Sequence, residues 1–430
     1  MPGLKLRDRL PHRWFSTLAV QFAILGFGVL GGIASGRLLG PEGRGSLAAI
    51  VLWPAALVLL VSLGMNQSIV FFTAKRRFPL TEIFAGSALI GLLQSVTVIL
   101  AGWLLMPVLL RRYTPVERHL YFGLLCTTPF IVLAGYIGNL FQGDGDLHTF
   151  NTLRVLPSAI YSLGLLVLLL KHLDRLSYAV IIQGSAYVVS FCFALTCLRK
   201  IVRPAPQVKS NVLSALATYG AKSHVGTIAS YLNQRVDQLI LSLLIAPFDL
   251  GLYAVATTMA GAAAVAPSAI GLLAFTHGSR QTEDQLKGTI VSSLRYSILC
   301  GFMFGIPLFL FARPLTIFFL GSKFAGSVLA CRILIPGVIG YGANQVLYSA
   351  AYAMEQPLLP SRAELAGLIV TVAGLALLAP YYGFLGAAVV STLGYLTSFV
   401  VMIYLASTKL RLRASDFFSS THRLAVAENG

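Results

Sequence analysis

The residues best suited to do chemistry lie in one apolar segment near the middle of the chain, 224–246. Asp237 is the only carboxylate placed deep within an apolar run, and Gln234 and Arg235 stand just before it. An ionisable group inside a membrane costs roughly 2.5–3.5 kcal/mol on insertion scales, so it is a functional candidate by default. Gln234 and Asp237 share a helical face with Ser230, whereas Arg235 lies about 200° around the helix from Asp237. Two interpretations stay open for Arg235 and Asp237: contact with a substrate or ion, or pairing with other helices that holds a bundle together.

The remaining acidic residues are expected in loops or near helix starts, and Glu364 is one of them. No Walker A loop, GxSxG elbow, HExxH pair or catalytic carboxylate pair occurs, and the seven histidines form no cluster. The segment 143–146 lacks the other ligands of an EF-hand and is interpreted as a turn. We therefore expect no enzyme activity, no cofactor and no metal.

The composition indicates which elements must position these residues. Of 430 residues, 57% are apolar and only 11% are charged, against about 25% charged in soluble domains. This excludes soluble enzymes, disordered tails and disulfide scaffolds, and it is typical of an α-helical protein that crosses a lipid bilayer many times. The net charge of +17 comes from basic residues beside apolar runs, which points to membrane topology and not to nucleic acid.

Hydropathy predicts about twelve membrane-spanning helices, each near 20 apolar residues long. The 44-residue uncharged run from Leu365 to Thr408 is too long for one helix, and the segment 380–383 supplies a turn within it. The predicted spans are 15–38, 45–73, 82–108, 119–141, 153–170, 177–198, 224–246, 250–276, 289–311, 327–353, 363–379 and 384–407. Basic residues are about twice as frequent on the face that holds both termini, which places the termini in the cytoplasm.

The polar connection 199–223 divides the spans into two sets of six. At an offset of 206 residues, Pro41 and Gly45 coincide with Pro247 and Gly251. The same residues would also arise because Pro and Gly favour tight turns. The agreement in topology favours a duplication, and parallel repeats in transporters hold the substrate between the halves. We therefore predict an all-α polytopic membrane protein with two six-helix bundles around a central cavity. Its parts are an N-terminal bundle 1–198, a cytoplasmic linker 199–223, a C-terminal bundle 224–408 and a cytoplasmic tail 409–430.

Two segments resemble the oligosaccharide flippases of bacteria, which belong to the multidrug/oligosaccharidyl-lipid/polysaccharide exporter superfamily. The segment 36–45 (GRLLGPEGRG) is similar to the first outer loop of these flippases. The segments 233–238 (NQRVDQ) and 251–256 (GLYAVA) resemble their seventh and eighth helices. The resemblance implies a multi-pass protein of the bacterial inner membrane that moves undecaprenyl-pyrophosphate-linked oligosaccharide to the outer leaflet by alternating access. It also implies a role in lipopolysaccharide or exopolysaccharide synthesis, beside a polysaccharide polymerase and chain-length proteins.

A carrier of pyrophosphate through hydrocarbon benefits from cations in its cavity, because they offset the desolvation of the phosphates. The predicted substrate-binding residues are Arg235, Asp237, Arg295, Gln234 and Arg332. For Arg332, and for the further candidate Lys222, a side chain that reaches the membrane interface is the simpler interpretation. Arg154 is equally well explained as a cytoplasmic anchor.

Two alternative functions stay open. The first is an ion-coupled drug antiporter of the same superfamily, which would need several membrane carboxylates where only Asp237 qualifies. The second is a membrane polysaccharide polymerase, which the short outer loops disfavour. Without a nucleotide site, transport must draw on a proton or sodium gradient or on consumption of the product.

Overall fold

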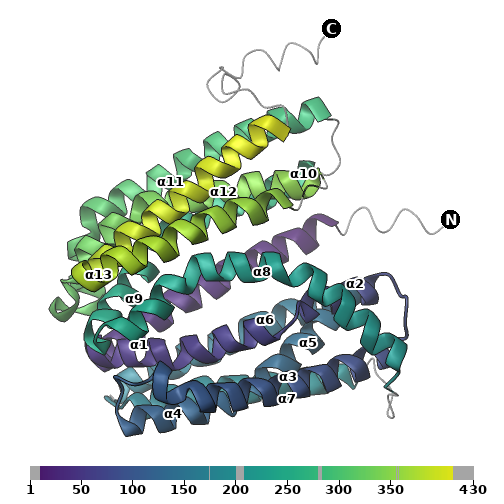
Figure 1. The fold of residues 1–430 in the computed structure, drawn as a ribbon, viewed down its shortest axis with the longest axis horizontal. Helices are drawn as coiled ribbons and strands as arrows, with labels where there is room; N and C mark the ends of the chain where they lie inside the picture. The colour runs from purple at the N-terminus through teal and green to yellow at the C-terminus, as the bar shows by residue number, and fades with distance from the viewer. Residues whose placement is uncertain are drawn as a thin grey trace. The chain divides into compact units, whose positions relative to one another are not determined.

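The computed structural model describes residues 10–173, 175–199, 208–278, 283–354, 356 and 358–409. Every regular element in this part of the chain is a helix (Figure 1), which confirms the predicted all-α class. The elements are α1 Leu10–Val61, α2 Met65–Ala74, α3 Leu80–Leu109, α4 Pro115–Leu125, α5 Thr128–Asp144, α6 Leu147–Leu170, α7 Leu176–Leu198, α8 Ser210–Leu244, α9 Pro247–Gly261, η1 Ala262–Ala264, α10 Val265–Gly278, α11 Glu283–Leu320, η2 Ser322–Phe324, α12 Ser327–Ala353 and α13 Leu358–Lys409. The predicted tail beyond Lys409 lies outside the described residues.

The two longest helices are each broken by a glycine. In α1 the break is at Gly40, with φ 66° and ψ −177°, and in α13 it is at Gly383, with φ 55° and ψ −137°. A positive φ is readily reached only by glycine, which has no Cβ. Pro41 and Pro380 stand beside the breaks and weaken helix continuity there. The turn predicted within the long uncharged run is therefore confirmed, and α1 and α13 are each two helices.

Nine helices of the described chain are long and apolar enough to cross a membrane, and two of them contain the glycine breaks. Helix α8 is long enough as well, but the polar residues 233–238 keep it out of this set. With the breaks and α8 included, the helices follow the twelve predicted segments. Large apolar side chains such as Leu104, Leu170 and Phe318 are about 70% exposed, as expected of side chains that face lipid.

Helix α8 begins inside the segment that polarity assigns to the linker. Residues 210–223 are helical, whereas 200–207 lie outside the described residues. The reason is that Val212 and Leu216, spaced one helical turn apart, are both fully buried. Burial of this apolar stripe stabilises a helix that the surrounding polar residues conceal in the sequence.

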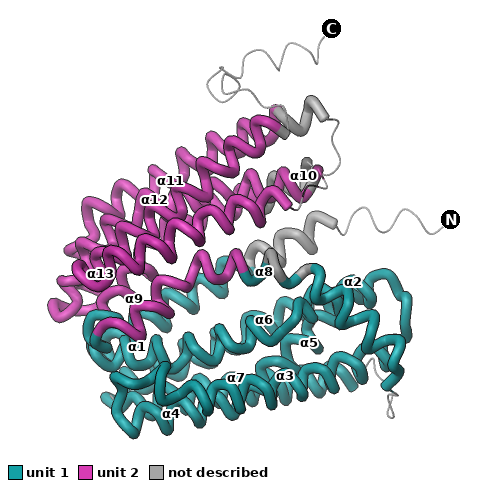
Figure 2. The backbone as a smooth tube through the Cα atoms, in the orientation of Figure 1, with its two compact units in different colours: residues 1–228, 246–251 teal, residues 229–245, 252–430 magenta. Residues whose placement is uncertain are grey.

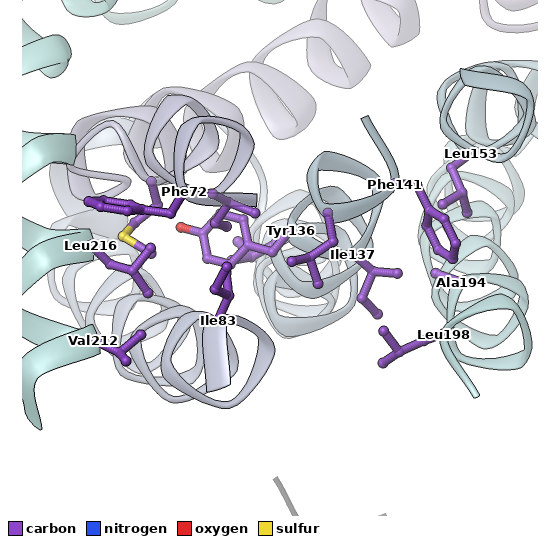
Figure 3. Close-up of a cluster of buried hydrophobic side chains, with 14 residues drawn as sticks. Phe72, Ile83, Tyr136, Ile137, Phe141, Leu153, Ala194, Leu198, Val212 and Leu216 are labelled. Carbon is purple, nitrogen blue, oxygen red and sulfur yellow. The ribbon is translucent and has the colours of Figure 1, made fainter. Parts of the chain in front are cut away.

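The described chain forms two compact units (Figure 2), which agrees with the prediction of two bundles. Unit 1 comprises the chain up to residue 228 together with 246–251. In its core, Phe72 of α2, Ile83 of α3 and Leu216 of α8 gather around Tyr136 of α5 (Figure 3). Ser68 Oγ donates a hydrogen bond of 2.8 Å to the carbonyl oxygen of Leu216, which fixes α8 against α2.

Unit 2 comprises residues 229–245 and the chain from 252 onward. Helix α12 packs against α10, α11 and α13 and is the most enclosed of the candidate spans. Its residues Val346 and Leu347 form a buried core with Ile290 of α11 and Met402 of α13. Among the polar residues of α12, Ser327 and Asn344 are fully buried and therefore lie inside the unit and not against lipid.

The two segments related by the 206-residue offset contact each other within unit 1. A Cβ added at Gly45 would lie 1.8 Å from the carbonyl oxygen of Pro247, and one at Gly251 would lie 1.8 Å from that of Pro41. The two contacts pair equivalent residues reciprocally, as an internal two-fold repeat requires. Only glycine permits this approach of backbone to backbone at either position.

Candidate functional site

Asp237 is the centre of a buried hydrogen-bonded cluster in unit 2. Its side chain is 2% exposed. Oδ2 accepts hydrogen bonds from Tyr253 Oη at 2.5 Å and from Ser391 Oγ at 2.8 Å. Oδ1 accepts one of 2.7 Å from the backbone N–H of Gln238. We call Asp237, Tyr253 and Ser391 the Asp237 cluster. Its donors satisfy the carboxylate, which is the condition for holding a charge away from water.

Three helices bring the Asp237 cluster together. Asp237 lies on α8, Tyr253 near the start of α9, and Ser391 on α13 after the break at Gly383. The two halves of α13 approach closely, since a Cβ at Gly394 would lie 2.0 Å from Thr371 Oγ1. Small residues permit such close helix packing in membranes. The glycine break therefore turns α13 back so that Ser391 reaches the carboxylate.

A second buried carboxylate lies in the same unit. Glu364 of α13 is 2% exposed, and Asn233 Nδ2 donates a hydrogen bond to its Oε2. Asn344 of α12 donates to Tyr348 Oη at 2.8 Å and to Ser398 Oγ at 3.2 Å. Tyr348 Oη and Ser398 Oγ also share a hydrogen bond of 3.0 Å. We call Asn233, Glu364, Asn344, Tyr348 and Ser398 the Glu364 cluster.

Three oxygen atoms of the Glu364 cluster are buried without a hydrogen-bond donor. They are Asn233 Oδ1, Asn344 Oδ1 and Glu364 Oε1. Buried polar atoms are nearly always partnered, so unpartnered ones indicate a missing ligand or proton. Carboxylate and amide oxygens are the ligands that hard cations prefer. Protonation of Glu364 would instead convert one acceptor into a donor. The cluster is thus equipped to take up a small cation or a proton.

The structure separates the predicted residues of the seventh span. Asp237 is buried, whereas Arg235 is exposed and Gln234 is half-buried. Among the described residues the single ion pair joins Lys209 to Glu82, so Arg235 and Asp237 form none. Gln234 Nε2 donates to the carbonyl oxygen of Ser230 on its own helix, at 3.1 Å. The sequence prediction that Arg235 and Asp237 occupy different faces agrees with this geometry.

The structure places the other predicted cations on α8, α11 and α12. Arg332 donates a 3.0 Å hydrogen bond to the carbonyl oxygen of Phe309 and lies over its ring at 5.4 Å, which ties α12 to α11. Arg295 is half-buried on α11, and Lys222 is exposed on α8. Their predicted contact with substrate stays a prediction.

Glu364 is the residue that sequence reasoning places wrongly. The sequence predicts it near a helix start, yet α13 begins at Leu358 and buries Glu364 almost two turns later. The premise that Asp237 is the sole membrane carboxylate is therefore corrected. One feature of the sequence could have indicated its burial, since Glu364 directly precedes the long uncharged run. At that position, however, the sequence does not distinguish a charge inside a membrane span from a charge just before it.

Comparisons with known proteins identify the family and the fold. The family model for polysaccharide biosynthesis proteins matches residues 11–275. No curated protein matches the chain. An inward-facing multidrug resistance MATE family transporter of the MOP superfamily superposes with a TM-score of 0.70 at 14% identity, and the match covers 94% of this chain and all of that one. The lipid II flippase MurJ, in an inward closed conformation, gives 0.69 at 13% identity over 94% and 89%. The MATE multidrug transporter DinF-BH gives 0.67 at 16% identity over 97% and 98%.

These similarities are low in identity and cover nearly the whole chain, so they establish the fold. The family and the similar structures are transporters and flippases and not enzymes, which agrees with the prediction from the sequence. The family model covers more than half of the sequence, including nearly all of unit 1 and the start of unit 2. The chain belongs to the polysaccharide biosynthesis protein family.

Proposed function

We propose that the protein is a flippase of the bacterial inner membrane. It moves undecaprenyl-pyrophosphate-linked oligosaccharide from the cytoplasmic to the outer leaflet by alternating access, for synthesis of lipopolysaccharide or exopolysaccharide. Both termini lie in the cytoplasm, and a polysaccharide polymerase and chain-length proteins act after it. Arg235, Arg295, Arg332 and Gln234 contact the substrate.

The observation that carries this proposal is the match to the polysaccharide biosynthesis family over residues 11–275. The similarity in fold to a lipid II flippase supports a lipid-linked substrate. Polysaccharide precursors carried on a lipid are assembled on one side of a membrane and used on the other. A membrane protein of this family without catalytic motifs fits the step between these two sides.

Deletion of the gene tests the proposal. We expect lipid-linked glycan to be assembled and to remain in the cytoplasmic leaflet, and a plasmid copy to restore export. The distribution is measured by enzymatic access to the glycan in right-side-out and inverted vesicles. Elongation of glycan chains by the purified protein would contradict the proposal and favour a polymerase.

We further propose that translocation is coupled to a cation gradient through unit 2, with the Glu364 cluster as the uptake site and Asp237 as its buried neighbour. Asn233 and Asp237 are one helical turn apart on α8, about 6 Å along the axis. The three unpartnered oxygens support a sodium ion or a proton there. The sequence disfavours an ion-coupled antiporter because it indicates only one membrane carboxylate, Asp237. With Glu364 also buried, this objection to ion coupling no longer holds.

Replacing the carboxyl groups by amides tests the coupling. We expect Glu364→Gln to abolish stimulation of transport by a sodium or pH gradient in proteoliposomes. The matched control is Glu82→Gln, which changes a carboxylate outside both clusters. Unchanged stimulation in Glu364→Gln would rule out this site, whereas a sodium gradient acting alone would identify the ion.

A further inference from the structure

Unit 1 contains a cavity that the predicted site residues do not reach. Its volume is about 340 Å³, and it lies among α2, α5, α6 and α7. Its polar lining comes from Asn66, Asn139, Arg154, Tyr187 and Ser190. Volumes above roughly 300 Å³ with a few convergent polar groups are typical of small-molecule sites.

Arg154 is the only charged residue in the described lining, and neutral groups hold it. One Nη donates a 3.0 Å hydrogen bond to Gln21 Oε1, and the guanidinium lies over the ring of Phe150 at 5.4 Å. No carboxylate of the described chain lies within ion-pair distance of it. A cation inside a membrane helix is normally paired. The charge of Arg154 is therefore left for a ligand.

Two asparagines of the lining add N–H donors, whereas Ser190 Oγ already donates to the carbonyl oxygen of Ala186 at 2.6 Å. Asn139 Nδ2 donates to Asn66 Oδ1 at 2.8 Å. The amide nitrogen of Asn66 and the second N–H of Asn139 have no acceptor among the described residues. Together with the guanidinium they add N–H groups to a cavity lining that contains no carboxylate. Such a set matches phosphate oxygens.

Two glycines of α5 line the cavity, and each borders open space. A Cβ at Gly135 would meet nothing within 4 Å, and one at Gly138 would meet only Leu153 and Phe150 at 3.9 Å. No contact requires glycine at position 135 for packing, and glycine weakens a helix. A larger side chain at position 135 can therefore enter the open space beside it.

We infer that this cavity binds the pyrophosphate group of the lipid-linked substrate, with Arg154 as the principal cation; the inference rests on the proposed flippase function. Arg154 is seven residues from the start of α6, about 10 Å along the helix axis. In the predicted orientation, α6 starts at the cytoplasmic face. The cavity then lies just below the headgroup level, where a pyrophosphate would enter from the inner leaflet.

The test measures binding of geranylgeranyl pyrophosphate to the full-length protein in phosphatidylcholine nanodiscs. Arg154→Gln should weaken binding by about tenfold to a hundredfold, the loss expected for charge-assisted hydrogen bonds. Arg154→Lys should retain part of the affinity, because the charge remains and the planar fork is lost. Gly135→Val should narrow the cavity and weaken binding. Gly123→Val is the matched control, since a Cβ there also meets nothing within 4 Å but Gly123 does not line this cavity.

The competitors distinguish the sources of the anion. Inorganic pyrophosphate should displace the probe at higher concentration, whereas phosphatidylglycerol should not. Wild-type affinity in both Arg154→Gln and Gly135→Val, or displacement by phosphatidylglycerol as strong as by the prenyl pyrophosphate, would overturn the inference. Glycan export by the same variants separates the two proposals. Full export in Arg154→Gln rejects the cavity alone, whereas a wild-type protein that neither binds the probe nor exports glycan rejects the flippase function as well.

Discussion

The two units place their charged residues in opposite ways. Unit 2 buries two carboxylates, Asp237 and Glu364, each 2% exposed and hydrogen-bonded by neutral side chains. Unit 1 buries no carboxylate among its described residues, and its cavity contains an arginine held by a neutral amide. A buried carboxylate favours a cation or a proton, whereas a cation beside open donors favours an anion. Under the two proposals above, unit 2 responds to the ion gradient and unit 1 binds the pyrophosphate.

Removal of both buried carboxylates of unit 2 tests the proposed roles of the two units most directly. The double variant Asp237→Asn, Glu364→Gln should lose gradient-driven transport by about tenfold or more, because neither cluster can then gain or lose charge. Binding of geranylgeranyl pyrophosphate should stay within about twofold of wild type, since that site lies in unit 1. Both are measured on one preparation, with membrane abundance as the control. Loss of binding would show that pyrophosphate binding depends on the carboxylates of unit 2, which contradicts separate roles for the two units.

The hydroxyl of Tyr253 should stabilise the folded protein more than the hydroxyl of Ser391 does. Tyr253→Phe removes the shorter of the two hydroxyl bonds to Asp237 and should destabilise the protein by about 1–3 kcal/mol, the cost of a buried group left without its partner. Ser391→Ala should cost less, because the shorter bond remains. Thermal unfolding in detergent measures both. Tyr121→Phe is the control in unit 1, where the phenol makes a long 3.4 Å bond to the carbonyl oxygen of Gly102; an equal loss there would contradict a special role for the Asp237 cluster.

A carboxylate placed beside Arg154 should make unit 1 resemble unit 2. Gln21→Glu puts a negative charge where the neutral amide now accepts the hydrogen bond. It should weaken prenyl pyrophosphate binding by several-fold, because an ion pair of about 1 kcal/mol must be broken first. The affinity is measured at low and high salt, and salt should reduce the difference from wild type. Tighter binding in Gln21→Glu would show that the ligand does not use the charge of Arg154.

The exposed ion pair of unit 1 should contribute least to stability and transport. Lys209 Nζ and Glu82 Oε1 are 2.5 Å apart, and the lysine side chain is 48% exposed. Exposed pairs contribute about 0–1 kcal/mol. Lys209→Ala should therefore shift thermal unfolding slightly and leave transport unchanged. A large loss of transport in this variant would show that unit 1 contributes to transport through this ion pair and not through the cavity.

Local chemistry explains what the sequence predicts well. The breaks at Gly40 and Gly383 follow from Gly and Pro at fixed positions, and the number of spans follows from the length of apolar runs. Helix α8 extends into the predicted linker because Val212 and Leu216 find a core made by other helices. The sequence of the linker alone does not reveal this stabilisation, because the residues that bury Val212 and Leu216 lie on other helices.

The site was harder to predict, because burial depends on neighbours distant in the sequence. Glu364 is enclosed by Asn233, 131 residues away, and by α12. Arg154 looks like an interfacial anchor until Gln21, 133 residues away, and the cavity are placed beside it. Residue type indicated that these groups were candidates, but their partners come from the packing of separate helices.

The reciprocal contact at Gly45 and Gly251 bears on the ancestry of the chain. A contact that pairs one position with a second, and the second with the first, is the isologous contact of a symmetric dimer. Fusion of two identical six-helix subunits would leave such a contact inside one polypeptide. In a dimer of identical subunits, one substitution alters both symmetric contacts. In a fused chain, a substitution alters only one of them. Gly43 and Arg44 differ from Asp249 and Leu250 at the same offset, whereas the proline and the glycine that touch are the same in both segments.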